Sequence, residues 1–112
     1  MNANEYQALA MRTRNKTLST RDHILNGVLG LCGEAGEAAD IVKKAFMQGH
    51  HFDREHIMKE LGDCLWYIAE TAAALGVDMD TIAQQNIEKL EKRYPDGHFD
   101  VKRSMHRESG DI

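Results

Sequence analysis

The chain contains a single proline, Pro95, in 112 residues. Because proline interrupts helices and marks turns, the residues before it are free to form long, unbroken helices. Valine, which favours strands, occurs four times against twelve alanines, the best helix formers. This composition argues against a sandwich or barrel of strands and predicts an all-α protein.

Apolar periodicity and helix-capping residues divide the chain into four helices with short connections. Ser19 or Thr20 is the expected N-cap of the longest helix and Asp53 that of the next, while Gly49 and Gly76 are the expected stops. Short loops make neighbouring helices antiparallel, so we expect an antiparallel helical bundle. The predicted helices cover 4–14, 20–47, 53–75 and a segment from Asp78 or Asp80 to Tyr94.

The length suggests one domain over residues 1–112, with a folded core at about 4–99. The tail at 100–112 is polar, and from Lys102 onwards it lacks periodicity, so we expect it to be loose or to lie on a partner. A domain this small buries only about 60–70% of its unfolded surface, so oligomerisation would help to complete the bundle.

The net charge is −4, from 14 basic and 18 acidic residues, which gives no support to binding of nucleic acid or of an anionic membrane surface. No apolar run approaches the roughly 20 residues of a membrane span, and the N-terminus lacks the apolar core of a signal peptide. Cys32 and Cys64 lie in apolar helical segments and are predicted to be reduced thiols. We therefore expect a cytoplasmic protein.

Glycine recurs at every third position in the longest predicted helix, at Gly27, Gly30, Gly33 and Gly36. Each glycine costs about 0.5–1 kcal/mol relative to alanine in a helix. Close approach of a second helix explains such a row, and so does room for a ligand beside acidic residues. The two explanations are compatible.

Two pairs of acidic residues lie in apolar stretches of consecutive helices, Glu34 with Glu37 and Glu60 with Asp63. Each pair has a spacing of three, which places both carboxylates on one helix face. If the helices are antiparallel neighbours, four carboxylates converge, and a cation is needed to offset their repulsion. Oxygen ligands favour Mg²⁺, with Mn²⁺ as a substitute. The alternatives are ordinary surface acids and a di-iron site, but the latter requires Glu-x-x-His, which neither pair provides.

Other polar residues fall at helical spacing from these acids or from one another. Lys44 follows Glu37 by two turns and Tyr67 follows Asp63 by one, while a separate face of the last helix carries Asn86, Lys89 and Arg93. Taken alone, this face of the last helix is typical of a solvated basic strip, but beside a metal site its cations Lys89 and Arg93 would neutralise a polyphosphate. His50 and His51 have no partners at ligand spacing and are expected to be solvated, and Trp66 is expected in a core or interface.

The acid pairs, separated by twenty-two residues, resemble the signature of the all-α nucleoside triphosphate pyrophosphohydrolases. This superfamily includes MazG, the dimeric dUTPases, the dCTP pyrophosphatases and phosphoribosyl-ATP pyrophosphohydrolase. Three longer strings resemble the small MazG-like group: LGLCGEAGE at 29–37, ELGDCLWY at 60–67 and NIEKLEKRYP at 86–95. The resemblance covers roughly residues 4–99.

The resemblance implies a helical bundle assembled as a homodimer or homotetramer, and Mg²⁺-dependent cleavage of a nucleoside or deoxynucleoside triphosphate to the monophosphate and pyrophosphate. Glu34, Glu37, Glu60 and Asp63 would bind the metal, and Glu37 is our candidate for the general base. Lys89 and Arg93 would contact phosphate, and Tyr67 and Asn86 match substrate-contacting positions; Lys44 is added from helix geometry alone. The alternative function is a non-catalytic, metal-dependent nucleotide sensor or a helical interaction module.

Overall fold

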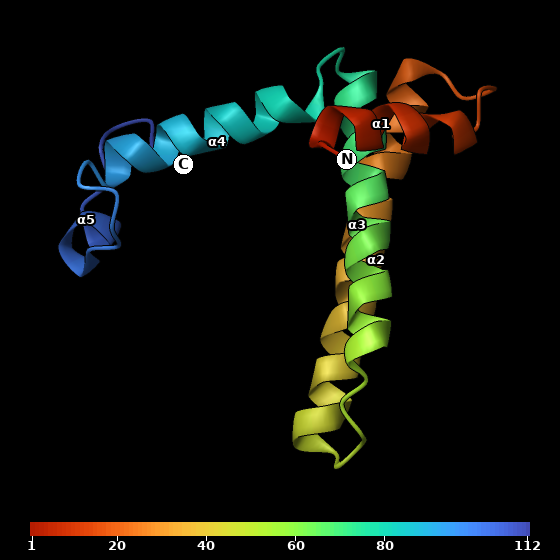
Figure 1. Cartoon of the computed structure of the whole chain (residues 1–112), viewed down its shortest axis with the longest axis horizontal. Helices are drawn as coiled ribbons and strands as arrows, with labels where there is room; N and C mark the ends of the chain where they lie inside the picture. Colours follow the sequence, from red (N-terminus) through yellow and green to blue (C-terminus); the bar gives the residue numbers. More distant parts are fainter. The chain divides into compact units, whose positions relative to one another are not determined.

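The computed structural model describes all 112 residues and is entirely helical, which confirms the predicted fold class (Figure 1). The chain divides into two compact units, residues 1–79 and 80–112. Its elements are α1 (Ala3–Ala10), the 3₁₀ turn η1 (Met11–Thr13), α2 (Thr20–Met47), α3 (Arg54–Ala74), α4 (Met79–Arg93) and α5 (Val101–Met105). None of these helices combines the length and the hydropathy that crossing a membrane requires.

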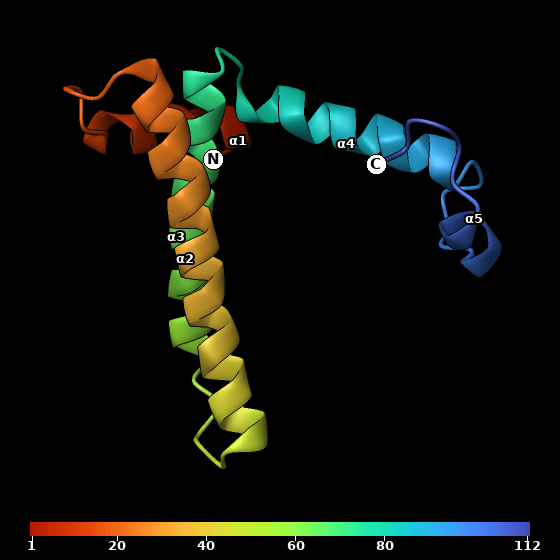
Figure 2. The ribbon, with the colours of Figure 1, turned by 180° about the vertical axis from the view of Figure 1, so that it is seen from behind.

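The first unit is built on α2 and α3, which lie side by side and antiparallel in opposite views (Figures 1 and 2). The short segments α1 and η1 pack on α3. This pairing confirms that the two helices with the acidic residues are antiparallel neighbours. Since α4 falls in the second unit, the first unit is a helical pair with an N-terminal cap, and the expected bundle of four helices remains a prediction for an assembled protein.

The ends of α2 and α3 follow the predicted capping residues. The side chain of Ser19 accepts a hydrogen bond from the backbone N–H of Asp22 at 3.1 Å, and that of Asp53 accepts one from His56 at 3.0 Å. These bonds satisfy backbone donors that a helix leaves free in its first turn. Gly49 and Gly76 have φ values of 71° and 74°, the left-handed conformation that glycine adopts easily after a helix.

The N-terminal segment is held to α3 by Trp66. Its indole N–H donates to the backbone oxygen of Ala10 at 3.2 Å and to Oγ1 of Thr13 at 2.9 Å. The predicted helix at 4–14 therefore becomes α1 followed by the tighter turn η1. Trp66 has the structural role that the sequence favours, because it fixes this turn against α3.

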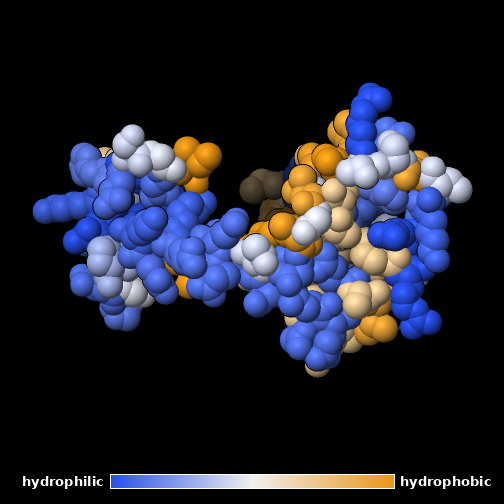
Figure 3. Space-filling view, turned by 90° about the horizontal axis from the view of Figure 1, so that it is seen from above, coloured by the Kyte–Doolittle hydropathy of each residue, from blue (hydrophilic) through white to orange (hydrophobic).

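The core of the first unit is thin. Its buried apolar side chains are alanines, Ala10, Ala69 and Ala72, and the largest fully buried side chain is that of Glu70. Many large apolar side chains of α2 and α3 remain exposed, among them Leu29, Phe46 and Leu61. Figure 3 shows apolar atoms at the surface of the end that carries α1. Such surface is more than a small soluble monomer usually leaves uncovered.

The second unit gives the tail more order than the sequence predicts. Asp100 caps the short helix α5 by accepting a hydrogen bond from the backbone N–H of Arg103 at 3.0 Å. The rings of Tyr94 and Phe99 pack with their centroids 5.7 Å apart. Beyond α5 the chain returns to α4, where Asp111 forms an ion pair with Arg93.

Candidate functional site

Three of the four predicted metal ligands converge between α2 and α3. One carboxylate oxygen from each of Glu34, Glu37 and Glu60 lies within 4.8 Å of the others. Glu34 and Glu37 share a face of α2 because they are one turn apart, and the antiparallel packing brings Glu60 of α3 opposite them. The fourth, Asp63, is exposed and lies outside this group of three.

Two oxygens in this group are buried and have no hydrogen-bond partner, Oε2 of Glu34 and Oε2 of Glu60. Glu60 is only 7% exposed, and its other oxygen, Oε1, lies 3.1 Å from Nε2 of His56. A buried carboxylate oxygen without a partner is strongly unfavourable. The two oxygens without a partner could accept a positively charged ligand, and the donor set of carboxylates fits a hard divalent cation.

The proximity of the carboxyl groups favours the protonated form of Glu34. The pKa of Glu34 is raised to about 7, first by a hydrogen bond with Glu60, then by burial and by the charges of Glu37, Glu60 and Asp63. The same hydrogen bond, from Glu34, is the main cause that holds the pKa of Glu60 below its ordinary value. A proton on Glu34 would therefore reduce the repulsion within the cluster.

A cavity of about 590 Å³ adjoins the acidic group. Glu37 and Glu60 line it, and so does Lys44, which the sequence places on the same face of α2. Nζ of Lys44 lies 2.8 Å from Oδ2 of Asp40, which also lines the cavity. The remaining walls come from the α2–α3 loop and the start of α3, through His50, His51, Asp53 and His56.

The sequence does not predict that these loop residues line a cavity, because His50 and His51 have no partners at ligand spacing and are expected to be solvated. Their exposure is as predicted, but they line a cavity that also contains two of the acids. One signal was available: His56 precedes Glu60 by four residues, so the two side chains were bound to be neighbours on a helix. The path of the loop offered no such signal, because it depends on how the helices pack.

The four glycines of α2 divide into two functional classes. A Cβ atom on Gly27 would collide with Thr71, and one on Gly30 would collide with the ring of Tyr67, so these two permit the close approach of α3. Gly33 and Gly36 have no such neighbour within 4 Å, and both line the cavity. Close approach of a second helix therefore explains Gly27 and Gly30, while room for a ligand beside Gly33 and Gly36 stays a prediction.

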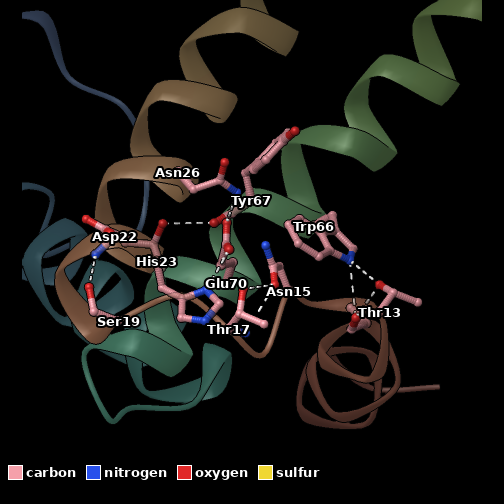
Figure 4. A network of polar contacts seen from close by, with 12 residues as sticks. Thr13, Asn15, Thr17, Ser19, Asp22, His23, Asn26, Trp66, Tyr67 and Glu70 are labelled. Atoms are coloured by element: carbon pink, nitrogen blue, oxygen red, sulfur yellow. Dashed lines mark hydrogen bonds and ion pairs between the residues drawn. The ribbon is translucent and has the colours of Figure 1, made fainter.

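Glu70, one helical turn after Tyr67, is the most buried acid of the chain but belongs to a separate network (Figure 4). It is 1% exposed, and its oxygens lie 2.8 Å from Nδ1 of His23 and 2.8 Å from Nδ2 of Asn26. With both oxygens bound by α2, Glu70 holds the two helices together. This network leaves His23 outside the candidate site.

The remaining predicted residues lie elsewhere. Tyr67 packs edge-on against Trp66, with ring centroids 5.3 Å apart, and does not line the cavity. Asn86, Lys89 and Arg93 belong to α4 in the second unit, where Asn86 is exposed. Nζ of Lys89 donates to the backbone oxygen of Ile112 at 2.7 Å, and Arg93 binds Asp111. Their predicted contacts with substrate remain predictions.

A scan against protein families matches residues 24–98 to the MazG nucleotide pyrophosphohydrolase domain, two thirds of the chain. The chain belongs to the MazG family. The matched region contains all four predicted metal ligands and the whole of α4.

Among curated proteins, the chain is 41% identical over 69 residues to the Gene 37 protein of Mycobacterium phage L5. The match covers 58% of this chain and 60% of that protein, so the chain spans about three fifths of the length of the curated relative. No solved structure matches the chain. Family membership thus identifies a pyrophosphohydrolase domain, and the name of the phage protein adds no activity to it.

Proposed function

We propose that this MazG-family protein hydrolyses nucleoside or deoxynucleoside triphosphates to the monophosphate and pyrophosphate in a Mg²⁺-dependent reaction. The observation that carries the proposal is the pair of buried, unpartnered oxygens on Glu34 and Glu60, beside a cavity large enough for a small molecule. Together with the family, this arrangement supports a metal centre that receives a phosphate-bearing substrate.

The acidic residues would bind the metal ion, and one of them would also act as the general base. Glu34, Glu37 and Glu60 would hold the cation, with Asp63 as the fourth ligand, since its charge already influences Glu34. Mg²⁺, or Mn²⁺ in its place, would supply neutralisation of the charge that develops on the phosphate oxygens. Glu37 would take a proton from an attacking water, a role that its exposure and its position in the cavity wall support.

The cationic residues would hold the phosphates and the leaving pyrophosphate. Lys89 and Arg93 would do this from α4, with Asn86 as a further polar contact, and each cation would first exchange its present bond to the tail. Lys44, which is paired with Asp40, would instead contact another part of the substrate from the cavity itself. Tyr67 would act indirectly, because its ring packs against Gly30.

We also propose that the protein functions as a homodimer or homotetramer in the cytoplasm. The apolar side chains left exposed on α2 and α3 support assembly, because a second copy would remove them from water. The free thiols of Cys32 and Cys64 are compatible with a reducing compartment. Measurement of the mass in solution by light scattering tests the assembly.

The decisive experiment measures pyrophosphate release from a panel of canonical, deoxy and oxidised triphosphates, with and without Mg²⁺. Glu37→Gln should abolish most of the release while the helical circular dichroism persists. Glu55→Gln is the matched control, because Glu55 is an exposed acid at the start of α3 that lies outside the cavity. Equal pyrophosphate release by Glu37→Gln and Glu55→Gln would refute the assignment of Glu37 to the active site.

Calorimetry with a non-hydrolysable triphosphate separates the alternatives if no turnover is found. Mg²⁺-dependent binding without turnover of any substrate would identify a nucleotide sensor. The absence of any binding would identify an interaction module and would exclude the proposed enzyme.

A further inference from the structure

The cavity beside the acidic centre is long enough to hold more than phosphate. Gly33 and Lys44 both line it and are eleven residues apart on α2, about 16 Å along the helix axis. One end contains Glu37 and Glu60, and the other is formed by the α2–α3 loop. A triphosphate held at the acids therefore leaves the loop end for another part of the ligand.

The charge at the loop end does not suit a polyanion. Lys44 is its one permanent cation and is paired with Asp40 at 2.8 Å, while Asp53 adds a second carboxylate. Acids in excess over permanent cations repel phosphate. The loop end is therefore suited to the uncharged part of a nucleotide.

The side chains of His50 and His51 are available for such a group. Neither imidazole makes a hydrogen bond or ion pair within the chain, and both line the cavity. A neutral imidazole offers one donor and one acceptor on a planar ring, which complements the edge and the face of a nucleobase. The apolar side chain of Ile41 lies on the same cavity wall.

The loop that carries these histidines is fixed at several points. The backbone N–H of His50 donates to the backbone oxygen of Lys44 at 3.1 Å, and Asp53 caps α3. The rings of Phe46 and Phe52 stack across the loop with their centroids 5.5 Å apart. These contacts hold the backbone that carries the two imidazoles before any ligand binds, which reduces the backbone entropy that binding would cost.

We propose that His50 and His51 are the base-recognition residues of the site and contact the nucleobase of a nucleoside triphosphate whose phosphates lie at Glu34, Glu37 and Glu60. The inference rests on the proposed function and adds the orientation of the substrate in the cavity. It assigns selection among bases to the α2–α3 loop of the same chain.

The test compares His50→Ala, His51→Ala and the double variant with the wild type. His106→Ala is the matched control, because His106 is exposed in the second unit and lines no cavity described above. The readouts are kcat/KM for triphosphates with different bases, and inhibition by nucleoside monophosphate and by inorganic pyrophosphate. Pyrophosphate lacks a base and so reports on the phosphate end alone.

Each loop variant should raise KM and weaken monophosphate inhibition about three- to tenfold, the effect of one lost hydrogen bond. The differences in kcat/KM between bases should narrow, and pyrophosphate inhibition should be unchanged. If the loop variants weaken inhibition by pyrophosphate as much as inhibition by monophosphate, the loop binds phosphate. If no readout changes in these variants, the loop lies outside the site. Either result overturns the inference while leaving the hydrolytic activity intact.

A wild type that cleaves no triphosphate would instead refute the proposed function. Calorimetric binding of nucleoside monophosphate in the presence of Mg²⁺ then decides the role of the loop. Binding that His50→Ala and His51→Ala weaken and His106→Ala does not would support base recognition, and binding unaffected by all three would reject it.

Discussion

Arg93 donates a hydrogen bond to each carboxylate oxygen of Asp111, with Nε 2.8 Å from Oδ2 and Nη2 2.6 Å from Oδ1. Both side chains are largely buried, with about a tenth of their surface exposed. The two parallel bonds give this ion pair a defined geometry that a single contact would lack. It anchors the end of the tail to α4.

The ion pair between Arg93 and Asp111 should be lost only at acidic pH. Arg93 holds the pKa of Asp111 below its ordinary value of 3.8, so the stabilisation is fully present above pH 3.8 and is lost as the pH falls further. The Nε–H resonance of Arg93 in an NMR titration should therefore stay constant from neutral pH to about pH 4.

Asp111→Asn should shift the same resonance at every pH, because the amide cannot accept two charge-assisted bonds. Asp96→Asn, an exposed substitution in the same unit, is the control and should leave the resonance unchanged. A titration of the wild type centred near neutral pH would contradict the assignment.

Gly30→Ala and Gly36→Ala should change stability in opposite directions. At Gly30 the added methyl group meets the ring of Tyr67, so the free energy of unfolding should fall by about 1–3 kcal/mol. At Gly36 nothing lies within 4 Å, so the higher helix propensity of alanine should raise it by about 0.5–1 kcal/mol. Urea unfolding followed by circular dichroism measures both, and changes of the same sign would refute the division of the glycines.

The stability of the metal-free protein should fall as the pH rises from 4.5 through 7. Folding raises the pKa of Glu34 from 4.5 to about 7, so the folded protein binds a proton that the unfolded chain has released. The stabilisation is complete below pH 4.5 and is lost as the pH passes 7. Thermal unfolding in a chelator should show this decline, and Glu34→Gln should flatten it.

Glu55→Gln serves as the control for this pH dependence, because it removes an exposed acid of α3 and should preserve the slope of the wild type. A decline of equal steepness in Glu34→Gln would show that the proton resides elsewhere.

His23→Ala should destabilise the protein more than Asn26→Ala. Both residues bind Glu70, which is 1% exposed, but only His23 offers the carboxylate a partner that can carry positive charge. Removal of one partner from a buried ion pair costs about 3–5 kcal/mol, whereas a hydrogen bond to a charged group contributes about 1.5–3 kcal/mol. Urea unfolding at pH 6 measures the two losses, and an equal or larger loss in Asn26→Ala would contradict this order.

Local signals in the sequence predicted the helical frame well. Ser19 and Asp53 cap α2 and α3 as expected, because a cap depends on residues three positions away. Helix α5 was missed, since five residues are too few to establish periodicity. The bundle of four was expected from loop lengths, which do not determine where α4 packs.

The candidate site was predictable where it follows helical spacing. Glu34, Glu37 and Glu60 converge because two residues one turn apart face a neighbouring helix. The loop histidines and the exposure of Asp63 depend on tertiary packing, which no spacing encodes. The same holds for the glycines, because Tyr67 opposes Gly30 while open space faces Gly36.

Glu60 and Glu70 are buried acids ten residues apart in α3, but they differ in their hydrogen-bond partners. Glu70 is saturated by His23 and Asn26, and it has no vacancy for an outside ligand. Glu60 contacts His56 through one oxygen and keeps the other buried without a partner. A cation that entered between α2 and α3 would therefore find an open ligand atom at Glu60 and none at Glu70.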